Sequence, residues 1–422
     1  MAIVRAGARR DMAIKSMAER YVRPDWVRRL NAMGESVGGR VEGARKLVPI
    51  EPASLLEEAV RDVGDPKSDF GDSGWRARFA SLARALDASP LHVVGRLLTR
   101  QELLRSLRTR LLLAHAVDRE PAIESERIEA PVIVTGPARS GTSILFELIW
   151  LDPALRAPLA WEALHPVASP PGAGGARLSW SECEQELWSD VQPEFAAIHE
   201  LRSDLPVECV TLTEPCFCGP HWSMISQAAG PPDFERMFDF HRRILQVLQH
   251  GASGRNWLLK TPSHLMTLDL LFATYPDAWV IQTHRDPAKT MPSTVSTTAM
   301  VQWMRTDEID LDSLAAIICD FFTFALNDVA ERRARHDLPD RFVDVHFHDL
   351  LRDPVATVRA AYDRMGRRLT DEHAEAIRGY VAGKPRGKFG AHQYTPEEWG
   401  FCAAGLRKSL APYIERFGVV LE

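Results

Sequence analysis

The chain has 422 residues, of which 45% are hydrophobic and 26% charged, as in a globular protein with a substantial core. Its 51 basic and 57 acidic residues give a formal net charge of −6, which argues against a general nucleic-acid binder. Six cysteines are too scattered for a disulfide framework, and the pair Cys216 and Cys218 has no second pair at zinc-finger spacing. We expect a cytoplasmic protein with no metal site and no transmembrane segment.

The N-terminal part of the chain has the apolar spacing of α-helices. From Ser54 to about Asp118, apolar residues recur three and four positions apart, and the last helix, over 96–110, is rich in Arg. Pro121 and Pro131 bracket a connector, so we expect a helical region at 1–125 that packs on a second domain at 126–422. The basic N-terminus and the Arg-rich helix are compatible with peripheral contact to anionic lipid. A solvated helix face or a homodimer surface explains them better.

After Pro131 the pattern changes to short apolar runs that are followed by helices. Runs at 132–134, 257–259, 279–281 and 342–345 predict strands that are buried on both faces. Asp286-Pro287 and Asp353-Pro354 each combine an N-cap residue with proline at the first helical position. This alternation predicts an α/β fold with a central parallel sheet flanked by helices. Residues 168–176, rich in Pro, Gly and Ala, predict a flexible loop.

The first strand leads into a turn with glycines at both ends, Gly136 and Gly141, and then into an apolar helix. The first amides of a helix have no partner and its dipole is positive there, so this turn is suited to an oxyanion. Arg139 adds a planar cation, and three hydroxyls add donors, those of Ser140, Thr142 and Ser143. The spacing is that of a Walker A loop, but Thr142 replaces its Lys, which argues against NTP hydrolysis. A turn that only connects strand and helix is the alternative.

Residues 131–145 resemble the 5′-phosphosulfate loop of the sulfotransferases that use 3′-phosphoadenosine 5′-phosphosulfate (PAPS). The resemblance is closest to the bacterial and tyrosylprotein branches, which carry Arg-Ser-Gly-Thr-Thr, and Ser143 is the one departure from that motif. It implies a P-loop-like fold and metal-independent transfer of a sulfuryl group from PAPS to an acceptor hydroxyl or amine. It also implies that the 5′-phosphosulfate is held by Arg139, Ser140, Gly141, Thr142 and Ser143.

Two further segments resemble the site for the 3′-phosphate in this family. One strand ends in Arg285, and Ser293 follows eight residues later, about two turns into the next helix. The basic, glycine-rich segment 383–394 resembles the family's loop over the 3′-phosphate, which implies binding by Arg386, Gly387 and Lys388. A surface ion pair at Arg285 and a solvated basic loop are the alternatives.

Lys260 follows a buried strand and resembles the family's catalytic lysine, which steadies the leaving oxygen. Glu162 lies 23 residues after Arg139, near the place of the catalytic Glu of the tyrosylprotein branch. A Glu held in a structural ion pair is the alternative, and His165 and Glu208 are rival bases. His264 is expected to be a local hydrogen-bonding residue.

The acceptor is poorly determined by sequence. Aromatic residues and Met between 176 and 250 suit an apolar pocket for a small-molecule or lipid alcohol, although most such residues belong to cores: Trp180, Trp188, Phe195, Phe217, Trp222, Met224, Phe234 and Phe238. Two other functions remain, a nucleotide-dependent kinase and a non-catalytic nucleotide-binding module. A kinase would need the Walker Lys, which this sequence lacks. A decayed module should have lost Glu162, Lys260 or Arg285, and all three are present.

Overall fold

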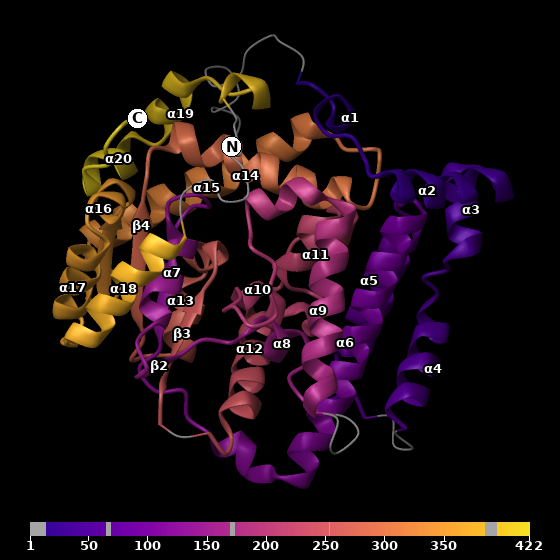
Figure 1. The fold of residues 1–422 in the computed structure, drawn as a ribbon, viewed down its shortest axis with the longest axis horizontal. Coiled ribbons are helices and arrows are strands. Elements are labelled where there is room, and N and C mark those ends of the chain that lie inside the picture. The colour runs from indigo at the N-terminus through magenta and orange to yellow at the C-terminus, as the bar shows by residue number, and fades with distance from the viewer. Residues whose placement is uncertain (1–13, 65–68, 169–173, 253, 385–394) are drawn as a thin grey trace.

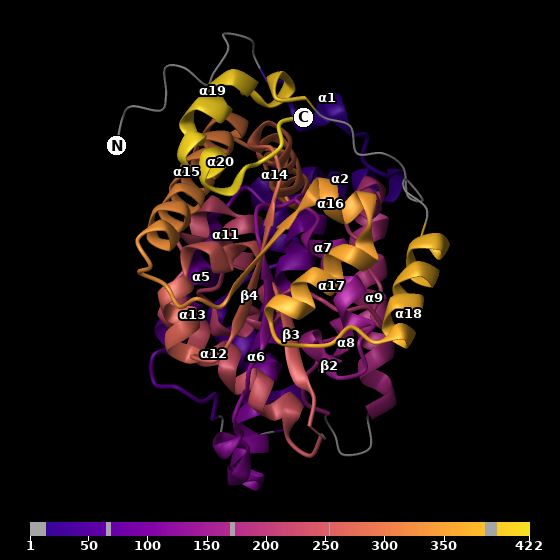
Figure 2. The same ribbon diagram turned by 90° about the vertical axis from the view of Figure 1, so that its left-hand side faces the viewer.

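The centre of the protein is a parallel β-sheet of five strands with helices on both faces (Figures 1 and 2). The computed structural model describes residues 14–64, 69–168, 174–252, 254–384 and 395–422. The strand order is β2-β3-β1-β4-β5. The strands are β1 (Val132–Thr135), β2 (Leu155–Arg156), β3 (Asn256–Lys260), β4 (Trp279–His284) and β5 (Phe342–His346). The predicted strands and the α/β fold class are confirmed, whereas β2 lies outside the prediction because two residues show no periodicity.

Successive strand residues point to opposite faces of the sheet and join different apolar clusters. Val132 and Val134 belong to the cluster that includes α7 (Thr142–Trp150), α17 (Pro354–Arg364) and α18 (Asp371–Gly383). Ile133 and Leu259 belong to the larger cluster, which includes α12 (Phe234–Gln249), α13 (Leu268–Thr274), α14 (Pro287–Trp303) and α15 (Leu311–Ala334). The continuous apolar runs of the sequence are explained by this burial on both faces.

Helices α14 and α17 begin at the predicted Asp-Pro pairs. The Asp286 carboxylate accepts a hydrogen bond from the Ala288 amide at 3.0 Å, and Asp353 accepts one from Ala356 at 2.9 Å. Each proline occupies the first turn, where its missing N–H costs nothing. Because β4 ends at His284 and α14 begins at Pro287, Arg285 is placed at the carboxyl edge of the sheet.

The N-terminal helices form a layer that is separated from the sheet by other helices, among them α12 (Figure 1), and several of their side chains join the larger apolar cluster. They are α1 (Met17–Arg20), α2 (Asp25–Gly38), α3 (Arg40–Leu47), α4 (Pro52–Val63), α5 (Trp75–Ala88) and the 27-residue α6 (Val93–Arg119). The predicted helical character of this region is confirmed. The division into domains at 125 and 126 stays a prediction.

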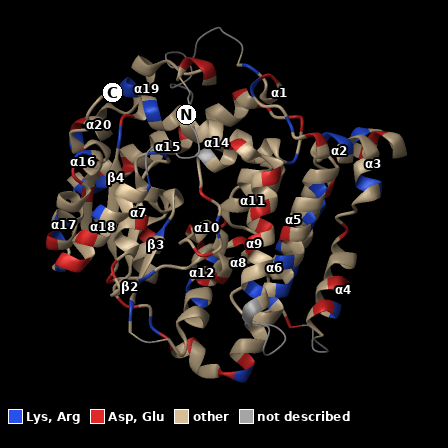
Figure 3. Ribbon diagram, viewed as in Figure 1, with Lys and Arg blue, Asp and Glu red and all other residues tan. Residues whose placement is uncertain are grey.

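The Arg-rich stretch of α6, blue on the ribbon of Figure 3, corrects one expectation, because its arginines form ion pairs within the protein. Arg96, Arg105 and Arg110 are buried. Arg105 forms ion pairs with Glu184 and Glu214, and Glu102 on the same helix pairs with Arg305 at 2.5 Å. A buried charge needs such a partner. These side chains bind α6 to the rest of the protein, so they are not a solvated face or a lipid-binding surface.

The remaining helices surround this frame. The α-helices are α8 (Ala160–Leu164), α9 (Gly174–Val191), α10 (Cys209–Leu212), α11 (Pro220–Ile225), α16 (Phe347–Arg352), α19 (Ala403–Ser409) and α20 (Ala411–Phe417). The 3-10 helices are η1 (Pro121–Ser125), η2 (Pro193–Ala197), η3 (Glu214–Cys216), η4 (Gln227–Ala229), η5 (Pro262–Met266) and η6 (Glu397–Trp399). Within the described ranges, only α15 is long and apolar enough to span a membrane, and 50% of its apolar window is buried in the protein. It packs against α14 and α20, as a core helix does.

Candidate active site

The turn between β1 and α7 requires glycine at both ends. Gly136 has φ 147°, and a Cβ there would lie 2.1 Å from Thr283 Oγ1. Gly141 has φ 92°, and its Cβ would lie 2.9 Å from the Phe347 ring. Arg139 also adopts a left-handed conformation, with φ 66°. The turn therefore wraps tightly in front of the first amides of α7, which is the geometry of an anion-binding loop.

The three hydroxyls of this turn are used differently. Ser140 is fully buried, and its Oγ donates to the Pro137 carbonyl at 2.5 Å and contacts Thr283 Oγ1 at 2.6 Å. Its amide bonds to the same carbonyl at 3.2 Å. The Ser140 hydroxyl is therefore engaged within the protein, and its expected donation to an anion stays a prediction. Ser143 Oγ instead lies 3.1 Å from Lys260 Nζ.

Lys260 stands beside this turn because β3 pairs in parallel with β1, with Lys260 opposite Val134. Its side chain is 3% exposed. The ammonium group donates to Ser143 and forms an ion pair with Glu208, the residue that precedes α10. Burial alone would raise the pKa of Glu208, but Lys260 and His199 outweigh it and hold that pKa below its ordinary value. A buried cation thus lies next to the anion-binding turn with a carboxylate behind it.

His199 is a partly buried imidazole close to this group of charges. Burial, assisted by the charges of Lys260 and Arg139 and opposed by that of Glu208, lowers the pKa of His199 to about 4. Its ring contacts Phe195 at a centroid distance of 5.7 Å, and its nitrogens have no hydrogen-bond partner among the described residues. A neutral imidazole with a free nitrogen can accept a proton. No motif in the sequence points to His199, which lies between η2 and α10.

Arg285 and Ser293 lie on the other side of the turn. Arg285 Nη1 donates to the Arg139 carbonyl at 2.8 Å, and its Nε and Nη2 donate to the Glu422 carboxylate at 2.7 and 2.9 Å. Its guanidinium also stacks on the Phe347 ring at 4.0 Å. Ser293 is fully buried, and its hydroxyl has no hydrogen-bond partner in the described part of the chain. A buried hydroxyl without a partner is costly unless a ligand satisfies it.

Comparisons with known proteins agree with this geometry. Residues 131–371 match a model described as the sulfotransferase family. The chain belongs to the sulfotransferase family. It is therefore an enzyme that transfers a sulfuryl group. The matched segment runs from the start of β1 to the start of α18, so it contains the whole sheet, the anion-binding turn, Lys260 and Arg285.

Several mycobacterial sulfotransferases are similar to this one. The crystal structure of STF9 from Mycobacterium avium has a TM-score of 0.76 and 25% identity, covering 88% of this chain and 97% of that one. STF1 from Mycobacterium tuberculosis has a TM-score of 0.68 and 27% identity, covering 85% and 98%. Omega-hydroxy-beta-dihydromenaquinone-9 sulfotransferase Stf3 from Mycobacterium bovis is 23% identical over 289 residues, which are 64% of this chain and 71% of that protein.

Two of the predicted bases in this sulfotransferase are engaged elsewhere. Glu162 Oε1 accepts from Arg156 at 2.8 Å, and its Oε2 accepts from the Leu159 amide at 3.1 Å, at the start of α8. His165 Nε2 lies 3.4 Å from Glu184, and its ring packs against Trp180. Their catalytic roles stay predictions, but the contacts of Glu162 are those of the structural alternative.

Three other expectations from the sequence have different outcomes in the structure. Arg386, Gly387 and Lys388 lie outside the described residues, as do residues 169–173 of the expected flexible loop. Both ring nitrogens of His264 are buried without a hydrogen-bond partner in the described part of the chain, which contradicts its predicted local hydrogen bonding. Of the aromatic residues proposed for an acceptor pocket, four belong to the larger apolar cluster as core residues: Phe195, Phe217, Trp222 and Phe238.

Proposed function

We propose that this sulfotransferase moves the sulfuryl group of PAPS to the hydroxyl of a small-molecule or lipid alcohol. One observation carries the proposal. The buried Lys260 ammonium lies 3.1 Å from Ser143 at the start of α7, so a cation and unpaired helix amides face the same place. A 5′-phosphosulfate that binds there would have its leaving phosphate oxygens stabilised by both.

The second phosphate of PAPS would bind Arg285 and Ser293. Arg285 already touches the turn through the Arg139 carbonyl, and the orphaned Ser293 hydroxyl fits a ligand that supplies an acceptor. The planar guanidinium suits a phosphate, which it can bind through two parallel hydrogen bonds. These residues would distinguish PAPS from nucleotides that lack a 3′-phosphate.

We assign the role of proton acceptor to His199. In the reaction the acceptor oxygen attacks sulfur, the bond from sulfur to the 5′-phosphate oxygen breaks, and the hydroxyl proton passes to a base. The nitrogens of His199 have no hydrogen-bond partner within the described ranges, and its pKa of about 4 makes the imidazole neutral at pH 7. Glu208 is held by Lys260, and we assign to it the role of positioning that ammonium.

An apolar alcohol is the acceptor class that we propose. The name of the relative Stf3 specifies a hydroxylated menaquinone derivative, an apolar molecule with a hydroxyl group. In this chain α9 exposes Leu178 and Trp180, the latter against His165. Exposed apolar side chains on a helix beside the site would favour an acceptor with an apolar chain.

The donor is tested by calorimetry with 3′,5′-diphosphoadenosine, 5′-AMP and ATP·Mg²⁺. The proposal predicts tightest binding of 3′,5′-diphosphoadenosine, and a preference for ATP·Mg²⁺ would overturn it in favour of a kinase. A transfer assay with labelled PAPS and a panel of long-chain and aromatic alcohols tests the acceptor class. Nucleotide binding without transfer to any of these alcohols would favour the binding module.

A further inference from the structure

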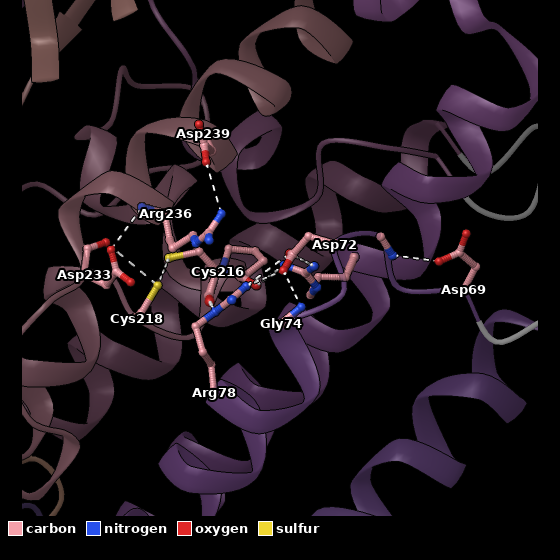
Figure 4. Close-up of polar contacts among 12 residues, drawn as sticks. Asp69, Asp72, Gly74, Arg78, Cys216, Cys218, Asp233, Arg236 and Asp239 are labelled. Carbon is pink, nitrogen blue, oxygen red and sulfur yellow. Dashed lines mark hydrogen bonds and ion pairs between the residues drawn. The ribbon is translucent and has the colours of Figure 1, made fainter. Parts of the chain in front are cut away.

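Cys216 and Cys218 lie side by side at the end of η3, with their sulfur atoms 3.5 Å apart (Figure 4). Residues two apart in an extended strand would be farther apart, but Phe217 between them has φ 60°. This left-handed residue turns the chain so that both thiols are on the same side. None of the six cysteines forms a disulfide within the described residues.

The turn that holds the two thiols is fixed by tertiary contacts. The Phe217 ring is buried and packs against Phe79 of α5 at a centroid distance of 5.1 Å. Arg78 Nε donates to the Cys216 carbonyl at 3.2 Å, and the Cys218 carbonyl accepts from the Asp233 amide at 2.9 Å. Arg78 is itself paired with Asp72 at 2.8 Å (Figure 4). The short distance between the sulfurs is therefore imposed by the fold.

The two thiols differ in exposure and acidity. Cys218 is partly exposed, and the hydrogen bond with Cys216 lowers its pKa, assisted by the charge of Arg78. Cys216 is buried, and burial raises the pKa of its thiol. The pair thus combines an accessible sulfur with thiolate character and a protected sulfur within reach of it. Nucleophilic cysteines have these properties, whereas structural cysteines are buried and inert.

We propose that Cys216 and Cys218 are a redox-active pair that a peroxide oxidises to a disulfide within the chain. The Cys218 thiolate attacks one oxygen of hydrogen peroxide and becomes a sulfenic acid, as the O–O bond breaks and the other oxygen takes up a proton and leaves as water. Cys216 then attacks the Cys218 sulfur, forms the S–S bond and releases water. The peroxide takes up two electrons, and the two thiol protons leave in the water formed. The sulfurs need to approach by about 1.5 Å, since a disulfide bond is about 2 Å long.

The pair lies close in sequence to the proposed active site. η3 follows α10, and α10 begins directly after Glu208, the partner of Lys260. The Glu214 carboxylate at the start of η3 pairs with the buried Arg105. A disulfide at 216 and 218 would thus alter the segment that carries both carboxylates.

The experiment is oxidation of the full chain by hydrogen peroxide, followed by unfolding, alkylation with N-ethylmaleimide and mass spectrometry. Trypsin cuts after Arg202 and Arg236 and releases one peptide with Cys209, Cys216 and Cys218. The proposal predicts that this peptide is alkylated at Cys209 alone. Its mass should be about 2 Da lower than that of the same singly alkylated peptide with Cys216 and Cys218 as thiols, and dithiothreitol should reverse the loss. Irreversible oxidation of Cys218 in the wild type would overturn it, as would earlier oxidation of the exposed Cys183.

Two variants separate a pair from independent thiols. In Cys216→Ala the partner is gone, so Cys218 should proceed to sulfinic and sulfonic acids instead of a disulfide. Alanine suits the buried position of Cys216, and the melting temperature reports whether the fold is kept. Cys183→Ala is the matched control and should leave disulfide formation unchanged. The same products in Cys216→Ala and the wild type would overturn the proposal.

Discussion

The guanidinium of Arg285 binds the carboxylate of Glu422 through two hydrogen bonds, at 2.7 and 2.9 Å. Glu422 is held in place by Asp286, which accepts from its amide at 2.9 Å, and by Arg407, which donates to its carbonyl at 2.7 Å. A carboxylate matches a phosphate in charge and in the fork that it offers to arginine. Glu422 is therefore bound to Arg285, the cation that we assign to the 3′-phosphate of PAPS.

Glu422→Gln should strengthen the binding of 3′,5′-diphosphoadenosine. The pair is partly exposed, so its net contribution is of the order of 1 kcal/mol, and we expect a gain of about 2–5-fold in affinity. Calorimetry measures it, and Glu415→Gln, an exposed carboxylate on α20, is the control. Unchanged or weaker binding would show that Glu422 does not compete with the ligand.

Ser293→Ala should weaken the binding of 3′,5′-diphosphoadenosine by about 3–10-fold, which is the effect expected from the loss of one hydrogen bond. Because the Ser293 hydroxyl has no partner in the described chain, its removal should not lower the melting temperature. Binding of 5′-AMP, which lacks the 3′-phosphate, is the internal control and should stay the same. Equal weakening of both nucleotides would assign Ser293 to the packing of α14 instead.

Lys260→Ala should lower kcat by about 100–1000-fold, as the loss of one preorganised electrostatic partner does. The affinity for 3′,5′-diphosphoadenosine should change much less, because the lysine acts on charge that develops in the transition state. Lys408→Ala, an exposed lysine on α19, serves as the control. Since Lys260 is buried against Glu208, the melting temperature must be measured in parallel. A kcat within about threefold of the wild type would contradict the assignment.

His199→Ala should lower kcat by about 100–10,000-fold, the range of a general base. In the wild type kcat should be flat from about pH 5.5 to 8, because a base must be unprotonated and the pKa of His199 is about 4. Activity is then lost only as the pH falls towards that value. An inflection near the ordinary histidine pKa of about 6.5 would contradict this assignment. A larger loss in Glu162→Gln than in His199→Ala would favour Glu162 as the base.

His264→Leu should stabilise the protein, more in acid than at neutral pH. Neither ring nitrogen has a hydrogen-bond partner among the residues that the structure describes, and burial lowers the pKa of His264 to about 3. Between about pH 6.5 and 3 the unfolded chain binds a proton there that the folded chain does not, so stability falls as the pH falls. The variant should gain about 2 kcal/mol more at pH 5 than at pH 7 in denaturant unfolding. His348→Leu, at an exposed histidine, is the control, and an equal gain at both pH values would contradict the expectation.

The sequence by itself determined four of the five strands, many of the helices and the glycine turn between β1 and α7. These features are local, since an apolar run, glycines with positive φ at 136 and 141 and an Asp-Pro helix start each act within a few residues. Lys260 and Arg285 were also predictable, because both stand where a buried strand ends.

Only the tertiary structure decided which of several similar side chains meet. Glu162 and Glu208 are the same residue type and differ in their contacts. Glu162 forms an ion pair with Arg156, whereas Glu208 forms one with Lys260. His199 and Glu422 come from segments without a pattern, and Glu422 reaches Arg285 because the chain beyond α20 packs on Asp286 at the start of α14. Contacts between residues far apart in sequence depend on the whole packed core, so no local pattern reports them.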